Sequence, residues 1–267
     1  MPIIAAYVSQ SACGIVIVGF QCTCHLVNMV KIVTAPVLNE RLDDVRGRIE
    51  AAALRCNRAP NEITLVAVSK THPAEIIREA IAAGVTDLGE NRVQEAESKI
   101  PEVGRHAARW HLIGHLQSNK ARRAVELFDV IHSLDSTALA QRLDRMCAEL
   151  SRPELAVMIQ VDLGREATKS GVDEAEVLQV VEALKQCERL RLTGLMTLPP
   201  YFETAEQVRP FFRKLRELRD ELSSQRAFGD LRGDLSMGMT HDYEIAIEEG
   251  ATIVRVGTAI FGAREKL

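Results

Sequence analysis

The sequence lacks the features that would point to a nucleic acid, a membrane or a disulfide framework. Its net charge is -4 and its pI is near 6.0, so the composition shows no basic excess for binding nucleic acid or an anionic membrane surface. Its six cysteines include no Cys-x-x-Cys pair, and we interpret them as reduced thiols of a cytoplasmic protein. The apolar stretch 14–20 is too short to cross a bilayer, which takes about 20 residues.

The beginning of the chain differs from the rest. No Lys or Arg precedes the apolar stretch 14–20, so the charged beginning of a signal peptide is missing. Met29 is a second possible start of the protein. We therefore expect residues 1–33 to be a poorly ordered or dispensable extension, and residues 34–267 to form a single domain.

Two groups of residues have the side chains of potential metal ligands. Cys22, Cys24 and His25 lie close together, but no second pair follows at the spacing of a structural metal site. His111 and His115 are four positions apart in a strand-like context, which does not place them on one face of a helix. We expect core or loop histidines and no bound metal.

From Pro36 onward, short apolar segments alternate with longer segments of helical periodicity. A leading amphipathic helix is predicted over 36–57, where apolar residues recur every three or four positions. Later segments have the length and β-branched composition of buried parallel strands. There are eight of them: 63–69, 86–89, 110–113, 130–134, 156–161, 192–198, 234–237 and 253–256.

This alternation, without a Pro/Gly/Ser-rich linker, predicts an α/β protein built as a single (β/α)8 TIM barrel. A doubly wound open sheet is the alternative. Its first strand would be followed by a Gly-x-Gly-x-x-Gly turn, whereas here the sequence reads Lys70-Thr71-His72-Pro73. Asp135-Ser136 and Thr240 have side chains that cap helices, and we predict a helix start at each of these two places.

Lys70 follows the first predicted strand, at the end of the barrel where such folds carry their chemistry. Burial among apolar residues favours a neutral amine, which is the form that condenses with an aldehyde to a Schiff base. A solvated lysine that merely ends a strand is the plainer interpretation. Lys70 alone does not decide between the two.

Small-residue turns follow the last two predicted strands, where barrels of this type commonly bind phosphate. Ser236, Met237 and Gly238 close the seventh strand, and Gly257-Thr258 closes the eighth. Glycine lets backbone N–H groups approach an anion, and the hydroxyls add donors. These turns therefore predict a phosphate site.

Arg255 interrupts the apolar run of the eighth predicted strand. A guanidinium buried there is costly unless it finds an acceptor. It either pairs with a carboxylate of a neighbouring strand or donates to a heteroatom of a ligand.

A Schiff-base lysine, a phosphate site and an arginine between them match the aldehyde, the phosphate and the ring nitrogen of pyridoxal 5'-phosphate (PLP). An arginine facing that nitrogen donates to an unprotonated ring, which is a weaker electron sink than a ring paired with a carboxylate. The residues thus predict PLP as the cofactor and support carbanion chemistry only weakly. A cofactor-free aldolase, in which Lys70 attacks a sugar phosphate, is an alternative.

Ordered motifs along most of the chain closely resemble the pyridoxal phosphate homeostasis protein family. They are AVSKT at 67–71, GENRVQE at 89–95, WHLIGHLQSNK at 110–120, KSG at 169–171, GLM at 194–196, LSMGM at 235–239 and RVGTAIFG at 255–262. The resemblance covers residues 36–264 and does not reach the first 30 residues.

The resemblance implies a barrel of the alanine-racemase N-terminal-domain type, with PLP held on Lys70 as a Schiff base. Asn91 would lie beside the ring, Arg255 would face its nitrogen, and the two small-residue turns would hold the phosphate. The predicted cofactor-binding residues are Lys70, Asn91, Met196, Ser236, Met237, Arg255, Gly257 and Thr258.

The family is known as a reservoir or carrier of PLP without an established catalytic activity. We therefore expect a non-catalytic protein of PLP homeostasis, with PLP-dependent apo-enzymes as acceptors. Racemases of this fold add a β-rich domain with a catalytic tyrosine, and we expect no such C-terminal domain here, since the sequence ends soon after the eighth predicted strand. A PLP-dependent racemase or decarboxylase of the same barrel fold is the alternative.

Overall fold

The computed structural model of this chain describes residues 35–164 and 170–262. The chain divides into two units, Met1–Ile32 and Val33–Leu267, and every described residue belongs to the second unit. The predicted extension of residues 1–33 lies outside the described ranges.

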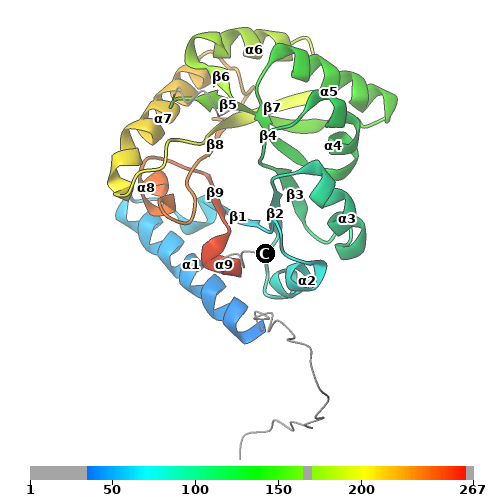
Figure 1. The fold of residues 1–267 in the computed structure, drawn as a ribbon. Coiled ribbons are helices and arrows are strands. Elements are labelled where there is room, and N and C mark those ends of the chain that lie inside the picture. Colours follow the sequence, from blue (N-terminus) through cyan, green and yellow to red (C-terminus); the bar gives the residue numbers. More distant parts are fainter. Residues whose placement is uncertain (1–34, 165–169, 263–267) are drawn as a thin grey trace, which may run out of the picture. The chain divides into compact units, whose positions relative to one another are not determined.

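A closed parallel sheet forms the centre of the second unit (Figure 1). Neighbouring strands pair in parallel, and the last strand returns to pair with the first. The predicted barrel with its leading helix is confirmed. In order around the barrel, the strands are β1 (Thr64–Val68), β2 (Asp87–Glu90), β3 (Arg109–Leu112), β4 (Val130–Leu134), β5 (Leu155–Asp162), β7 (Leu190–Thr197), β8 (Asp234–Ser236) and β9 (Ile253–Val256).

A further two-residue strand, β6 (Val172–Asp173), pairs with the end of β5. The sequence did not predict it, because two residues are too few to show a pattern.

Strands such as β1, β5 and β9 are largely apolar because the barrel buries both of their faces. Val66, Val130, Met158 and Ile253 belong to one buried cluster, whereas Ala67, next to Val66, belongs to the larger core beneath the helices. Successive residues of a strand therefore pack on opposite sides of the sheet. Every second residue of a strand thus points into the barrel.

Helices cover the outside of the barrel (Figure 1). The leading helix buries Leu38, Leu42, Val45 and Ile49 on one face, as their spacing predicts. Within the described ranges the helices are α1 (Ala35–Arg55), α2 (Ala74–Ala82), α3 (Val93–Val103), α4 (Ala121–Leu127), α5 (Thr137–Glu149), α6 (Val177–Leu184), α7 (Arg209–Ser224), α8 (Tyr243–Glu248) and α9 (Thr258–Phe261).

The two predicted helix caps differ in outcome. Ser136 caps α5, since its hydroxyl accepts from the N–H of Leu139 at 3.3 Å. The prediction for Thr240 is wrong, because α8 begins at Tyr243 and its N-cap residue is Asp242. Thr240 instead lies in the loop between β8 and α8.

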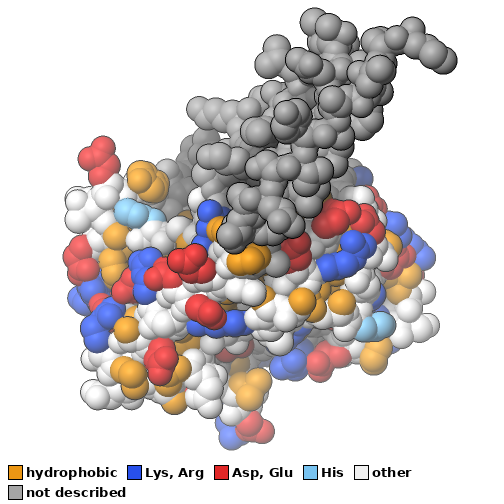
Figure 2. Space-filling view, turned by 90° about the horizontal axis from the view of Figure 1, so that it is seen from below, with side chains coloured by type: hydrophobic (Ala, Val, Ile, Leu, Met, Phe, Trp, Pro, Cys, Tyr) orange, Lys and Arg blue, Asp and Glu red, His pale blue; other side chains and the backbone are white. Residues whose placement is uncertain are grey.

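Acidic and basic side chains are interspersed on the face shown in Figure 2. Pairs such as Arg48 with Glu244 at 2.6 Å and Arg55 with Glu248 at 2.9 Å join α1 to α8. Among the described helices, none combines the length and the apolar composition needed to cross a membrane.

Candidate functional site

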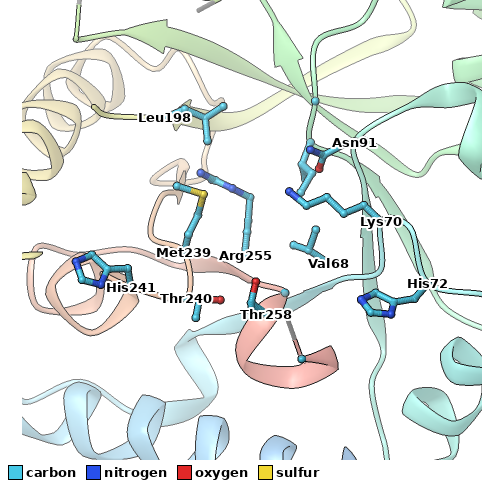
Figure 3. A pocket seen from close by; sticks show the side chains of 14 residues that line it. Val68, Lys70, His72, Asn91, Leu198, Met239, Thr240, His241, Arg255 and Thr258 are labelled. Carbon is cyan, nitrogen blue, oxygen red and sulfur yellow. The ribbon is translucent and has the colours of Figure 1, made fainter. Parts of the chain in front are cut away.

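A pocket of about 280 Å³ lies at the carboxyl ends of the barrel strands (Figure 3). Lys70 lines it from beyond the end of β1, Asn91 from the end of β2, and Arg255 from within β9. Gly257 and Thr258, which follow β9, form the adjoining wall. Because parallel strands place their carboxyl ends on one face of a barrel, five predicted residues from the ends of three strands meet in one pocket.

A buried ion pair fixes the backbone just before Lys70. Glu90 is fully buried, and its Oε1 accepts from Ser69 Oγ at 2.8 Å and from Lys99 Nζ at 2.9 Å. Lys99 Nζ also donates to the Ser69 carbonyl oxygen at 2.9 Å. Burial raises the pKa of Glu90, and the Lys99 ammonium and the Ser69 hydroxyl oppose that rise. The end of β1 is thus tied to β2 and to α3.

The residue after Lys70 has an unusual backbone conformation. Thr71 has φ = 66°, a left-handed value that β-branched residues rarely adopt. Its N–H donates to Glu95 Oε2 at 3.0 Å, and the N–H of His72 donates to the Ser69 carbonyl at 3.1 Å. The fixed turn directs the Lys70 side chain into the pocket (Figure 3). Backbone strain of this kind is typical of functional sites.

Arg255 is a buried cation with 2% of its surface exposed. Its Nη1 donates to Ser236 Oγ at 2.6 Å, and its Nη2 donates to the Thr197 carbonyl oxygen at 2.9 Å. Burial lowers its pKa to about 10, against the opposing effect of Asp242, so the guanidinium remains charged at neutral pH. Its partners in the described structure are a hydroxyl and a carbonyl, not a strand carboxylate. A guanidinium has five N–H donors, so others can face a ligand.

Two hydroxyls lie on the pocket wall, that of Thr240 in the loop after β8 and that of Thr258 at the start of α9 (Figure 3). Thr240 Oγ1 accepts from the N–H of Ala259 at 3.5 Å, which brings this loop against Thr258. Gly257 lies between β9 and α9, and a Cβ on it would lie 3.2 Å from the Val68 carbonyl oxygen. A larger residue would therefore push this segment away from β1. The sequence had assigned Thr240 only to a helix cap. Its signal as a ligand is a hydroxyl in a loop that follows a barrel strand.

Three predicted site residues lie behind the pocket wall. Met196, Ser236 and Met237 are fully buried, and the described lining of the pocket does not include them. Ser236 Oγ accepts from Arg255, and the N–H of Met237 donates to the Ile253 carbonyl oxygen at 3.1 Å. Their direct contact with a cofactor stays a prediction.

Several lining residues were not predicted as ligands. They flank the predicted positions at the strand ends, and only that proximity marks them in the sequence. They are Val68, His72, Ile113, Gly114, Leu198, Met239, Thr240, His241 and Gly262.

The two histidines that were weighed as a zinc pair have other partners. His111 lies buried between Asp87 and His132, and His115 pairs with Asp135 at 3.1 Å. Among the described residues, no group of three His, Cys, Asp or Glu side chains is placed to hold a metal ion.

Comparison with known proteins identifies close relatives. Residues 42–265 match the family model described as the alanine racemase N-terminal domain. A pyridoxal phosphate homeostasis protein of Aquifex aeolicus (strain VF5) is 45% identical over 226 residues, which cover 85% of this chain and 98% of that protein. The protein of the same name from Escherichia coli (strain K12) is 45% identical over 235 residues, covering 84% of this chain and 95% of that protein.

Solved structures agree with the sequence relatives. PipY of Synechococcus elongatus PCC7942 is 44% identical and covers 84% of this chain and 100% of its own, with a TM-score of 0.75 without PLP and 0.73 with PLP bound. An alanine racemase of Clostridium difficile 630, at 16% identity, covers 86% of this chain and 57% of its own with a TM-score of 0.63. The racemase likeness concerns the fold alone.

Proposed function

Because this chain belongs to the pyridoxal phosphate homeostasis protein family, we propose that it binds PLP and serves as an intracellular reservoir or carrier of that cofactor. One observation carries the proposal. The Lys70 side chain enters the pocket that Arg255, Thr240 and Thr258 also line. A structure of the relative PipY with PLP bound supports it.

The chemistry of the pocket residues fits this cofactor. Thr240, Thr258 and the backbone at Gly257 supply hydroxyl and N–H donors for a phosphate. Arg255 supplies a donor for the ring nitrogen, and Asn91 would lie beside the ring. The amine of Lys70 is then left for the aldehyde, so each polar group of PLP has a counterpart.

Lys70 is the residue that we assign to covalent capture. Its neutral amine attacks the aldehyde carbon, a C=N bond forms and one water molecule leaves. The turn held by Glu90, Lys99 and Glu95 keeps the amine in the pocket for that step. The result is a Schiff base that water reverses, which suits a protein that stores and releases its ligand.

The pocket residues favour binding of PLP over catalysis with it. A guanidinium does not give up its proton, so Arg255 donates a hydrogen bond to the ring nitrogen and leaves it unprotonated. PLP with an unprotonated ring is a weaker electron sink, which limits the carbanion chemistry of a racemase or decarboxylase. We expect no incorporation of deuterium at the α-carbon when amino acids are incubated with the loaded protein in deuterated water. Incorporation would favour the enzyme.

The acceptors that we propose are PLP-dependent apo-enzymes in the cytoplasm. Within the described residues Cys56, Cys147 and Cys187 are free thiols, as in a reducing compartment. Loaded protein mixed with an apo-enzyme should restore the activity of that enzyme. Faster restoration in direct contact than across a dialysis membrane would show contact-driven release, and no restoration at all would contradict the carrier role.

The experiment for the proposal as a whole is a visible absorption spectrum after dialysis. Wild-type protein incubated with PLP should keep a Schiff-base absorption band, and Lys70→Ala should lose it. Lys185→Ala is the matched control, because Lys185 is a surface lysine paired with Glu182. Loss of the band from all three proteins, or its retention in Lys70→Ala, would overturn the proposal.

A further inference from the structure

A continuous chain of hydrogen bonds crosses the interior of the barrel, which in this fold is usually filled by apolar side chains. The four members His111, His132, Ser236 and Arg255 are each at most 2% exposed, and Asp87 begins the chain. The distances are 2.9 Å for Asp87 Oδ1 to His111 Nε2, for His111 Nδ1 to His132 Nε2 and for His132 Nδ1 to Ser236 Oγ, and 2.6 Å for Ser236 Oγ to Arg255 Nη1.

The two ends of the hydrogen-bond chain, together with neutral imidazoles, fix the direction of every bond in it. The Asp87 carboxylate only accepts, so His111 donates from Nε2, and a neutral His111 then accepts at Nδ1. His132 must then donate from Nε2 and accept at Nδ1, and the Ser236 hydroxyl donates to it. At the other end Arg255 only donates. With both imidazoles neutral, as the burial of the two rings favours, each proton points from Arg255 toward Asp87.

The charges around the chain agree with this assignment. Burial lowers the pKa of His111, although Asp87 opposes that shift, and burial lowers the pKa of His132 well below its usual value. Burial alone would raise the pKa of Asp87, but hydrogen bonds from His111 and Thr86 outweigh it and keep the pKa below its usual value. A carboxylate at one end and neutral imidazoles between are the forms for which these bonds run in one direction.

The hydrogen-bond chain from Asp87 to Arg255 joins opposite ends of the barrel. Asp87 is the first residue of β2, and it lines a separate cavity together with Asn61 and Thr64 near the start of β1. Arg255 lines the pocket at the carboxyl ends of the strands. A residue that is remote from the pocket is thus connected to it by side chains alone.

We propose that Asp87, His111, His132 and Ser236 form a positioning chain that holds the Arg255 guanidinium for the ring nitrogen of PLP. The proposal rests on the proposed function for the identity of that nitrogen. The Asp87 carboxylate keeps both histidines in the tautomer in which His132 Nδ1 accepts a hydrogen bond from the Ser236 hydroxyl. The lone pairs of Ser236 then remain available to Arg255. In the opposite tautomer His132 would donate to Ser236, so His132 and Arg255 would share the lone pairs of one oxygen and the Ser236 proton would lose its acceptor.

Asp87→Asn tests the chain from the end remote from the pocket. Thr86 Oγ1 donates to Asp87 Oδ2 at 2.8 Å, so an amide is expected to keep its oxygen toward Thr86 and to turn its NH2 toward His111. A donor in that place reverses the tautomer of the histidine. Asp129→Asn is the matched control, since Asp129 is also partly buried and bonded to Arg105 but lies outside the chain.

The first readout is the tautomeric state of the histidines, measured by NMR on isotope-labelled protein without cofactor. Wild type and Asp129→Asn should show His111 and His132 neutral with the proton on Nε2. Asp87→Asn should move the proton of His111 to Nδ1. A protonated histidine, or an Nδ1 proton on either one, in the wild-type protein would overturn the chain whether or not PLP binds.

The second readout is affinity for PLP and for its carbocyclic analogue, in which C–H replaces the ring nitrogen. Asp87→Asn should bind PLP about 10-fold more weakly and the analogue within about twofold of wild type, since only PLP accepts from Arg255. Ser236→Ala, which removes the last link, should show the same selectivity and keeps the test open if Asp87→Asn does not fold. Asp129→Asn should bind both ligands as wild type does.

The outcomes separate this proposal from the proposed function. Equal losses for both ligands, or no loss for PLP, in Asp87→Asn and Ser236→Ala would show that the chain only fills the barrel. Failure of the wild-type protein to bind either ligand would remove the proposed function, and the positioning role with it. The tautomer measurement would then still decide whether the chain itself exists.

Discussion

Ser236 Oγ accepts a hydrogen bond from Arg255 Nη1 at 2.6 Å. The contact ties β8 to β9 inside the barrel, and it places the serine hydroxyl behind the pocket wall. Of the hydroxyls near the pocket, those of Thr240 and Thr258 are therefore the ones that we assign to the phosphate. Arg255, whose Nη1 is bonded to Ser236, is the donor that we assign to the ring nitrogen.

Replacing Arg255 by lysine should damage both stability and binding. A single ammonium lacks the planar fork that reaches Ser236 and Thr197 together, so one buried acceptor loses its donor. We expect the free energy of unfolding, measured in urea, to fall by about 1–3 kcal/mol and the affinity for PLP to fall at least about tenfold. Arg191→Lys, at an exposed position paired with Glu154, should change stability by less than about 1 kcal/mol. Equal effects of the two substitutions would contradict this role.

Glycine at position 114 is required by a close backbone approach next to the pocket. A Cβ there would lie 2.2 Å from the carbonyl oxygen of Asn91, so Gly114→Ala must displace Asn91. We expect a stability loss of about 1–3 kcal/mol from the overpacking together with weaker PLP binding. Gly47→Ala is the control, since Gly47 lies in α1 and a Cβ added to it would meet nothing within 4 Å, and it should stabilise the protein by about 0.5–1 kcal/mol. Similar results at both positions would refute the steric argument.

The ion pair behind Lys70 gives a third prediction. Lys99 and Glu90 have side chains that are 11% and 0% exposed, and removing one partner of a buried pair leaves an uncompensated charge. Lys99→Met should lower the free energy of unfolding by about 3–5 kcal/mol, and adding Glu90→Gln should recover part of that loss. Urea unfolding of the single and double variants measures the coupling. Strict additivity of the two substitutions would show that the pair has no such role.

His132 predicts a pH dependence of stability. Burial holds its pKa well below 6.5, and the positive charges of Arg255 and Arg109 and the neighbouring His111 act in the same direction. The unfolded chain therefore binds a proton that the folded chain refuses as the pH falls below about 6.5, and stability falls by up to about 1.4 kcal/mol per pH unit for that proton. Above that pH the contribution is constant.

His132→Gln removes this contribution, so its unfolding free energy should depend less steeply on pH than that of wild type between about pH 6.5 and pH 5. His106→Gln, at an exposed position, is the control. Parallel curves for wild type and His132→Gln would show that this histidine accepts a proton as readily in the folded state as in the unfolded one.

The barrel was predictable because buried parallel strands are short apolar runs that end at polar residues. The predicted segments 130–134 and 253–256 coincide with β4 (Val130–Leu134) and β9 (Ile253–Val256), and the other strands of the barrel deviate by one or two residues at their ends. Part of the pocket lining was predictable as well, since residues at the carboxyl ends of parallel strands meet on one face. This part consists of Lys70, Asn91, Gly257 and Thr258.

The sequence did not predict which polar side chains lie inside the barrel and which line the pocket. Ser236 and Thr240 are both hydroxyl residues near the end of β8, and only the register of β8 and the start of α8 decide which one lies on the pocket wall. The contact of His111 with His132 depends on the stagger between β3 and β4, where His111 is opposite Val130. A single sequence shows two polar residues in apolar strands but not that stagger.

The most direct test of covalent capture is reduction of the PLP-loaded protein with borohydride, followed by peptide mapping. Hydride from borohydride converts the C=N bond to a stable secondary amine and fixes the ligand to whichever lysine holds it. We predict that the peptide containing Lys70 carries the pyridoxyl group and that Lys70→Ala carries none at the site. A pyridoxyl group on a different lysine, or PLP that stays bound after dialysis but forms no reducible bond, would contradict the assignment of Lys70.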